Sequence, residues 1–189
     1  FMPWADDLFC LTDRWDVLIQ QVLKQTPAFS WQEVQDPKNH TAIVLDRKWV
    51  RAAGRFYPEY FPFWFADTWM KEVYGLAYGF DMPIVNQLKF SHKRGQTMNM
   101  HDLSFWFKFF ARTRVERAEE AKRICAAYEM PCAESDELLR YFEKGDALQQ
   151  EKIPLYEQAF GSGKSEKSET YKQAKEVALR WLHNNTEEL

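Results

Sequence analysis

The sequence predicts an α/β fold in which a sheet is flanked by helices and followed by a helical C-terminal tail. Three short runs of β-forming residues are bounded by proline, glycine or polar turn residues: Phe29–Val34, His40–Leu45 and Met82–Phe90. Apolar residues recur at helical spacing between these runs and through most of the chain after residue 103. We therefore expect a sheet-containing portion over 1–102 and a helical extension over 103–189.

The composition indicates one sizeable core and no strong overall charge. The 189 residues carry a formal net charge of −3, so no overall field attracts nucleic acid or anionic lipid. Aromatic residues make up 16% of the chain, and so many rings need a core, a sugar-stacking surface or an interface. The cysteines Cys10, Cys125 and Cys132 form no C-x-x-C pair, which suits a reducing compartment and predicts a cytoplasmic location. No apolar run approaches ~18 residues and no signal peptide is found, so we expect no membrane span.

The first residues predict a strand without its neighbours. The chain begins with Phe1 rather than methionine, and Phe1–Ala5 is apolar like the end of a buried strand. We interpret this start as the absence of an upstream portion of the protein. An opening strand without a neighbour would leave an unpaired edge, which predicts a homo-oligomer or an incomplete sheet.

Capping and breaking residues mark the expected helices. Thr12 or Asp13 can cap a helix whose apolar face begins at Trp15. A second helix is expected over Asp46–Ala53, with Gly54 as its C-cap. The remaining expected helices are a segment from Asp67 to Gly79, Phe105–Tyr128, Ser135–Leu148, Ile153–Phe160 and Ser168–His183.

Two adjacent carboxylates, Asp6 and Asp7, follow the expected opening strand. A strand that ends in acidic residues can present oxygen ligands at the carboxyl edge of an α/β sheet, where ligands bind. Mg²⁺ and Mn²⁺ prefer oxygen ligands and can be bridged to substrate phosphates. The same pair also fits a polar turn, since Asp favours turns and caps.

The segment Gly54–Met70 is dense in aromatic residues and leads into the expected helix at Asp67. Its prolines, Pro58 and Pro62, hold the chain out of a helix until that point. Asp67 then lies near a helix N-terminus, which favours a carboxylate. We interpret Asp67 either as a helix cap packed against an aromatic core or as a general base on an aromatic-walled acceptor site.

The segment Ser91–Gly95 gathers His92, Lys93 and Arg94 in an expected loop. It could supply a metal ligand, neutralise a diphosphate or serve only solubility, and a lone loop histidine is usually structural or exposed. The glycine-containing segment 161–165 lacks the spacing of a phosphate-binding loop and is interpreted as a flexible linker.

Three segments stand in a recognisable order along the first half of the chain. They are Trp4-Ala5-Asp6-Asp7-Leu8 with Thr12 and Trp15-Asp16 behind it, Asp46–Val50 through Gly54–Pro58, and Phe65-Ala66-Asp67-Thr68-Trp69. Together they resemble the second half of a GT-A glycosyltransferase of the family-2 kind, over about residues 1–102. The resemblance therefore implies a partial GT-A sheet flanked by helices.

The resemblance also implies roles for the matching residues. Asp7, with Asp6 beside it, would bind the metal on a nucleotide-sugar diphosphate, and His92 would be a late metal ligand or diphosphate contact. Asp67 would be the acceptor-side catalytic base. Lys93 and Arg94 would contact the substrate. The implied cofactor is Mn²⁺ or Mg²⁺, and the implied partners are a nucleotide-sugar donor and an acceptor hydroxyl.

An inverting sugar transfer uses these groups coherently. The cation offsets charge on the departing nucleoside diphosphate, and a carboxylate removes the proton of the acceptor hydroxyl. Trp64, Trp69 and Tyr60 could stack on an acceptor sugar or could pack in the core. The units that normally bind the donor nucleotide would lie upstream of Phe1, so we expect impaired nucleotide binding if this chain is all there is.

The sequence is also compatible with two other functions. The first alternative is a non-catalytic carbohydrate- or protein-binding domain that uses the aromatic-rich surface and the helical tail. The second is a hydrolase that uses Asp67 with His92 or His101, although no nucleophile motif supports it.

Overall fold

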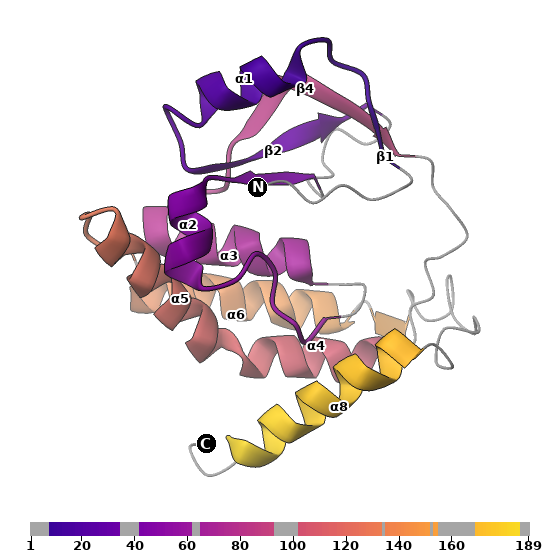
Figure 1. Ribbon diagram of the computed structural model, residues 1–189. Coiled ribbons are helices and arrows are strands. Elements are labelled where there is room, and N and C mark those ends of the chain that lie inside the picture. The colour runs from indigo at the N-terminus through magenta and orange to yellow at the C-terminus, as the bar shows by residue number, and fades with distance from the viewer. Residues whose placement is uncertain are drawn as a thin grey trace. The chain divides into compact units, whose positions relative to one another are not determined.

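The computed structural model describes most of the chain as strands, helices and their connections (Figure 1). The described residues are 8–34, 42–61, 65–92, 102–133, 135–151, 153–154 and 169–185. They contain a four-stranded mixed sheet and seven helices, so the predicted α/β class is confirmed. No helix among these residues is long and apolar enough to cross a membrane.

The residues group into two compact units that interleave along the chain. Unit 1 consists of Phe1–Tyr57, Asp67–Gly95 and Arg117–Glu134, and unit 2 consists of Pro58–Ala66, Gln96–Glu116 and Ser135–Leu189. Unit 1 contains the sheet, whereas the regular structure described in unit 2 is helical. The expected boundary between residues 102 and 103 lies inside the middle segment of unit 2.

The sheet of unit 1 has the strand order β1-β4-β2-β3. The strands are β1 (Leu8–Cys10), β2 (Ala28–Glu33), β3 (Ile43–Leu45) and β4 (Ile84–His92). The two outer pairs are antiparallel, and the central pair of β2 with β4 is parallel. The three expected strands between residues 29 and 90 are therefore confirmed as β2, β3 and β4. However, β4 continues to His92, so Ser91 and His92 are strand residues and their expected place in a loop is wrong. The expected strand Phe1–Ala5 lies outside the described residues.

A bulge in β4 interrupts its pairing with β2. Trp31 of β2 lies opposite Val85, but the next residue, Gln32, lies opposite Lys89. The Thr12 hydroxyl closes the bulge, because it donates to the carbonyl oxygen of Gln87 (3.1 Å) and accepts from the N–H of Lys89 (2.8 Å). The Thr12 hydroxyl is therefore hydrogen-bonded to β4 and is not available to cap a helix.

The expected capping of the first helix by Thr12 or Asp13 is wrong. Helix α1 (Trp15–Val22) begins after Arg14, which has a left-handed backbone (φ 52°) and makes no side-chain capping bond. Neither Thr12 nor Asp13 occupies the cap position. The helix itself, and its end before Pro27, are as expected.

Helix α2 (Arg47–Ala53) begins and ends where the sequence predicts. The Asp46 Oδ1 atom accepts the N–H of Trp49 at 2.6 Å, which caps the helix at its start. Gly54 ends it with a left-handed backbone (φ 79°) that glycine adopts without strain. Tyr128 also donates its hydroxyl to Asp46 and so ties α2 to α5 (Arg114–Ala127).

Helix α3 (Ala66–Tyr78) forms the core of unit 1 below the sheet (Figure 1). From Trp69 to Ala77 the helix is buried on nearly all sides, with Trp69, Val73 and Leu76 at 0% exposure. Gly79 ends α3 as expected, with φ 78°. A Cβ atom there would lie 3.1 Å from the Ala133 side chain, so this position favours glycine for both reasons.

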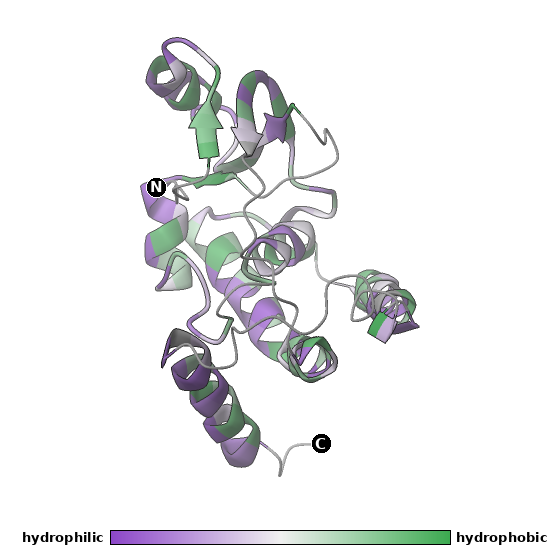
Figure 2. Ribbon diagram, turned by 90° about the vertical axis from the view of Figure 1, so that its right-hand side faces the viewer, coloured by the Kyte–Doolittle hydropathy of each residue, from purple (hydrophilic) through white to green (hydrophobic). Residues whose placement is uncertain are grey.

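Unit 2 is built from α4 (Leu103–Arg112), α6 (Asp136–Glu151) and α8 (Glu169–Asn184). Its core is aromatic: Phe61, Phe65, Trp106, Phe109 and Phe110 are buried and in ring contact. Figure 2 shows hydrophobic and hydrophilic residues mixed along α8, as expected of an amphipathic helix.

The expected single helix over Phe105–Tyr128 is wrong in one respect. It is divided at Thr113, whose backbone leaves the helical region between α4 and α5. The Thr113 hydroxyl donates to the carbonyl oxygen of Phe110 at 2.9 Å and so competes with the continuing helical ladder. The helices expected near 135–148 and 168–183 are confirmed as α6 and α8, whereas 155–168 lies outside the described residues.

Candidate functional site

Asp67 lies in the first turn of α3, as the sequence predicts. Its side chain is 30% exposed, so a ligand can reach the carboxylate. The Lys71 ammonium group, one turn further along, lies 3.4 Å from Asp67 Oδ2. The helix N-terminus and this cation both favour negative charge at the position.

The phenol of Tyr57 belongs to the surroundings of Asp67. Burial first, and then the charge of Asp67, raise the pKa of Tyr57 well above its ordinary value. The hydroxyl therefore keeps its proton at neutral pH and remains a hydrogen-bond donor near the carboxylate. A carboxylate beside a neutral phenol and an ammonium group can accept a proton and orient a bound hydroxyl.

The N-terminal end of β1 lies beside the C-terminal end of β4. The antiparallel register makes Leu8 the partner of His92, and Leu8 is the residue bonded to Asp7. In Figure 1 these two strand ends lie on the same side of unit 1 as the first turn of α3. Asp6 and Asp7 lie outside the described residues, and only the backbone of His92 is described.

The other predicted site residues have different surroundings. Trp69 is fully buried, and its ring is flanked by the guanidinium groups of Arg55 and Arg117 at 5.0 and 5.1 Å. It is therefore a core residue of unit 1 rather than a surface for stacking a sugar. Trp64, Lys93 and Arg94 lie outside the described residues.

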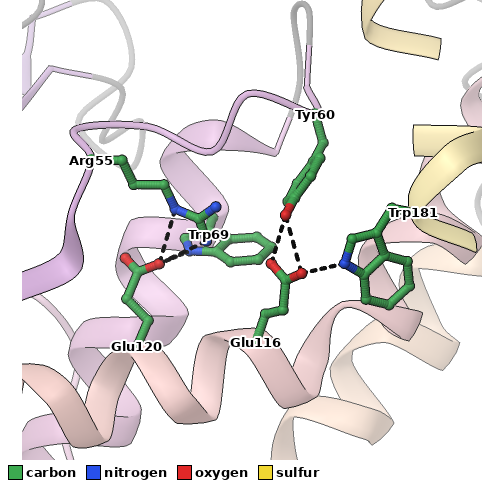
Figure 3. Close-up of polar contacts among 6 residues, drawn as sticks. All are labelled: Arg55, Tyr60, Trp69, Glu116, Glu120 and Trp181. Carbon is green, nitrogen blue, oxygen red and sulfur yellow. Dashed lines mark hydrogen bonds and ion pairs between the residues drawn. The ribbon is translucent and has the colours of Figure 1, made fainter. Parts of the chain in front are cut away.

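Tyr60 belongs to unit 2, where it has a carboxylate partner. Its hydroxyl donates to the carboxylate of Glu116, whose Oε1 and Oε2 atoms lie 3.1 and 3.0 Å from the hydroxyl oxygen. The indole N–H of Trp181 also donates to Glu116 (Figure 3). These contacts hold the Tyr60 ring by its polar end, and its edge packs against Phe109.

The structure adds a buried polar cluster that the sequence analysis missed. In Figure 3, Arg55 and Trp69 converge on Glu120, a residue of α5 that is 1% exposed. Its Oε2 atom accepts from Arg55 at 2.9 and 3.2 Å and from the Trp69 indole at 3.2 Å. Because Trp69 is two residues from Asp67, the cluster fixes the first turns of α3.

A sequence signal for this cluster exists. Glu120 shares its helix face with Arg117, Ala121 and Ile124, at spacings of three and four residues. All four are buried. Charges that share a face with small and apolar residues indicate a paired, buried network rather than a solvated helix surface.

Replacing Glu120 by glutamine is expected to change the pH dependence of stability. Burial raises the pKa of Glu120 despite the opposing Arg55 charge. The folded state therefore holds the proton more tightly than the unfolded state, whose pKa is about 4.3. As the pH rises from that value through the folded-state pKa, the wild type should lose stability relative to Glu120→Gln. Urea unfolding of both proteins between pH 4 and 7 measures this difference, and a difference that grows with pH in favour of the wild type would contradict it.

Among the described residues, no three His, Cys, Asp or Glu side chains converge as metal ligands. This finding does not include Asp6 and Asp7, which lie outside those residues. Comparison of the chain with models of protein families, with curated proteins and with solved structures finds no match.

Proposed function

We propose that this chain is the catalytic, acceptor-side portion of a GT-A glycosyltransferase of the family-2 kind. It would transfer a sugar from a nucleotide-sugar donor to an acceptor hydroxyl with inversion, assisted by Mn²⁺ or Mg²⁺. One observation carries the proposal. The residue that follows the acidic pair, Leu8, is the sheet partner of His92, so segments more than 80 residues apart in sequence meet at one edge of the sheet.

The proposed metal ligands fit the chemistry of the cation. Asp6 and Asp7 supply hard carboxylate oxygens, which Mg²⁺ and Mn²⁺ prefer, and His92 supplies an imidazole that Mn²⁺ accepts. When bound, the cation offsets the negative charge of the nucleoside diphosphate. Lys93 and Arg94 directly follow His92 in the chain and would add positive charge for the same diphosphate.

Asp67 is the proposed general base. It would take the proton of the acceptor hydroxyl while the acceptor oxygen forms its bond to the anomeric carbon. The bond from that carbon to the diphosphate oxygen breaks, and the diphosphate leaves with the electron pair. The exposure of Asp67, its place at a helix N-terminus and the neighbouring Tyr57 donor support this role.

Mn²⁺ binding tests the metal part of the proposal without a donor substrate. Loss of a group that only hydrogen-bonds to a metal ligand commonly weakens metal binding about 10–100-fold, so loss of the ligand itself in Asp7→Ala should weaken it at least this much. Electron paramagnetic resonance of free Mn²⁺ during a titration measures the affinity. The matched control is Asp16→Ala, which removes an exposed carboxylate of α1 in the same unit.

The proposed metal site and a non-catalytic binding domain give different results in this experiment. If Asp7 is a metal ligand, the wild type and Asp16→Ala should bind Mn²⁺ tightly and Asp7→Ala should not. A non-catalytic binding domain would show Mn²⁺ binding that is absent, or equal in all three proteins, and sugar binding that is unaffected by Asp67→Asn.

A further inference from the structure

An open pocket of about 640 Å³ lies in unit 1 at the other end of α3 from Asp67. It lies between α1 with the loop that follows it, the last turn of α3, and the start of β4. Its polar and aromatic lining includes Gln21, Gln25, Tyr74, Tyr78, Phe80 and Gln87. Asp67 and Tyr78 are eleven residues apart on one helix, which corresponds to about 16 Å along its axis.

The pocket has an aromatic wall. Tyr74 and Tyr78 are stacked with their ring centroids 4.6 Å apart, and both rings stack on buried Trp49. Phe80 packs its edge against Tyr74 at 5.6 Å and is itself 58% exposed. Trp49 and Tyr74 form the buried back of this wall, Tyr78 is partly exposed, and the ring of Phe80 is the most accessible to a ligand.

The polar groups of the pocket are neutral. Gln21, Gln25 and Gln87 are exposed, and no hydrogen bond of their side-chain amides is found within the described part of the chain. Burial raises the pKa of Tyr74 and of Tyr78, so both phenols keep their protons. No lining residue that the structure describes is charged.

We propose that this pocket binds an uncharged saccharide. A sugar ring has an apolar face that can lie on Phe80 and hydroxyl groups that both donate to and accept from amides. Gln21, Gln25 and Gln87 supply both kinds of partner around the ring. A phosphate or carboxylate ligand would be desolvated here without a cationic side chain, so the neutral lining disfavours it.

This site is distinct from the proposed catalytic edge and does not depend on it. Among the residues that the structure describes, its lining does not include Asp67. Saccharide binding should therefore persist in the presence of a metal chelator and in the Asp67→Asn variant. These two conditions separate a failure of this inference from a failure of the proposed catalytic function.

Saturation-transfer NMR of the full chain, with cellobiose, maltose, lactose and chitobiose as neutral probes and with EDTA present, tests the inference. We expect saturation transfer to at least one disaccharide. Phe80→Ala should weaken its binding about tenfold, as expected for loss of an aromatic stacking contact. Gln87→Ala should also weaken it.

The matched control is Phe9→Ala, since Phe9 is a similarly exposed phenylalanine of unit 1 (51%) that does not line the pocket. It should bind as the wild type does. The inference is overturned if no neutral disaccharide shows saturation transfer, or if Phe9→Ala and Phe80→Ala have equal effects. Tighter binding of glucuronate or glucose 1-phosphate would overturn it as well. Because Phe80 is exposed, its substitution should leave the thermal unfolding temperature unchanged, which excludes misfolding as the cause of a loss.

Discussion

Replacing Arg117 by alanine is expected to lower the free energy of unfolding by about 3–5 kcal/mol. The Arg117 side chain is fully buried, and its Nε atom lies 3.1 Å from Oε1 of Glu72, although the N–H is not aligned for a hydrogen bond. Its guanidinium group also lies over the ring of Trp69. Truncation would leave the Glu72 carboxylate buried without this counter-charge, and that penalty dominates the effect.

Urea unfolding followed by tryptophan fluorescence measures the change. The matched control on the same helix is Lys122→Ala, because Lys122 pairs with Glu119 at 3.0 Å but both side chains are more than half exposed. An exposed pair of this kind contributes about 0–1 kcal/mol. The double substitution Glu72→Met with Arg117→Met should recover much of the loss. Equal effects of Arg117→Ala and Lys122→Ala would refute the assigned role of the buried pair.

Replacing Asp67 by asparagine is expected to slow sugar transfer by about 10²–10⁴-fold, the usual contribution of a positioned general base. The amide keeps the size of the side chain but cannot accept the acceptor's proton. Release of nucleoside diphosphate from UDP-, GDP- and dTDP-linked sugars, with Mn²⁺ and an added acceptor, measures the rate. Stability should change little, because the Asp67–Lys71 pair is partly exposed.

Asp81→Asn is the control for this experiment. Asp81 is an exposed carboxylate just beyond the other end of α3, in the same unit. Its substitution should leave the rate unchanged. An Asp67→Asn protein that transfers sugar at the wild-type rate would rule out Asp67 as the base, whatever the donor.

Local chemistry made several element boundaries predictable. Asp46 and Gly54 define α2, and Gly79 ends α3, because capping oxygens and left-handed glycines act through neighbouring backbone groups. The position of Asp67 in the first turn of α3 was predictable for the same reason. Such signals need no knowledge of the rest of the fold.

Features that depend on distant partners were not predictable in this way. Thr12 has the residue type of a helix cap, but its hydroxyl bonds to β4, 75 and 77 residues away in sequence. The strand β1 is three residues long and exists through its pairing with β4. The meeting of Leu8 with His92 follows from that pairing alone, so one half of the candidate site required a tertiary structure.

The interleaving of the two units constrains how the protein can be synthesised. Glu72 leaves the ribosome long before its counter-charge Arg117, and the intervening segment Gln96–Glu116 belongs to the other unit. At about 5–20 residues per second, translation from Gly95 to Glu134 takes about 2–8 s. During that interval α5 has not yet been made to cover α3. The apolar surface of α3 is then open to chaperones or to neighbouring nascent chains.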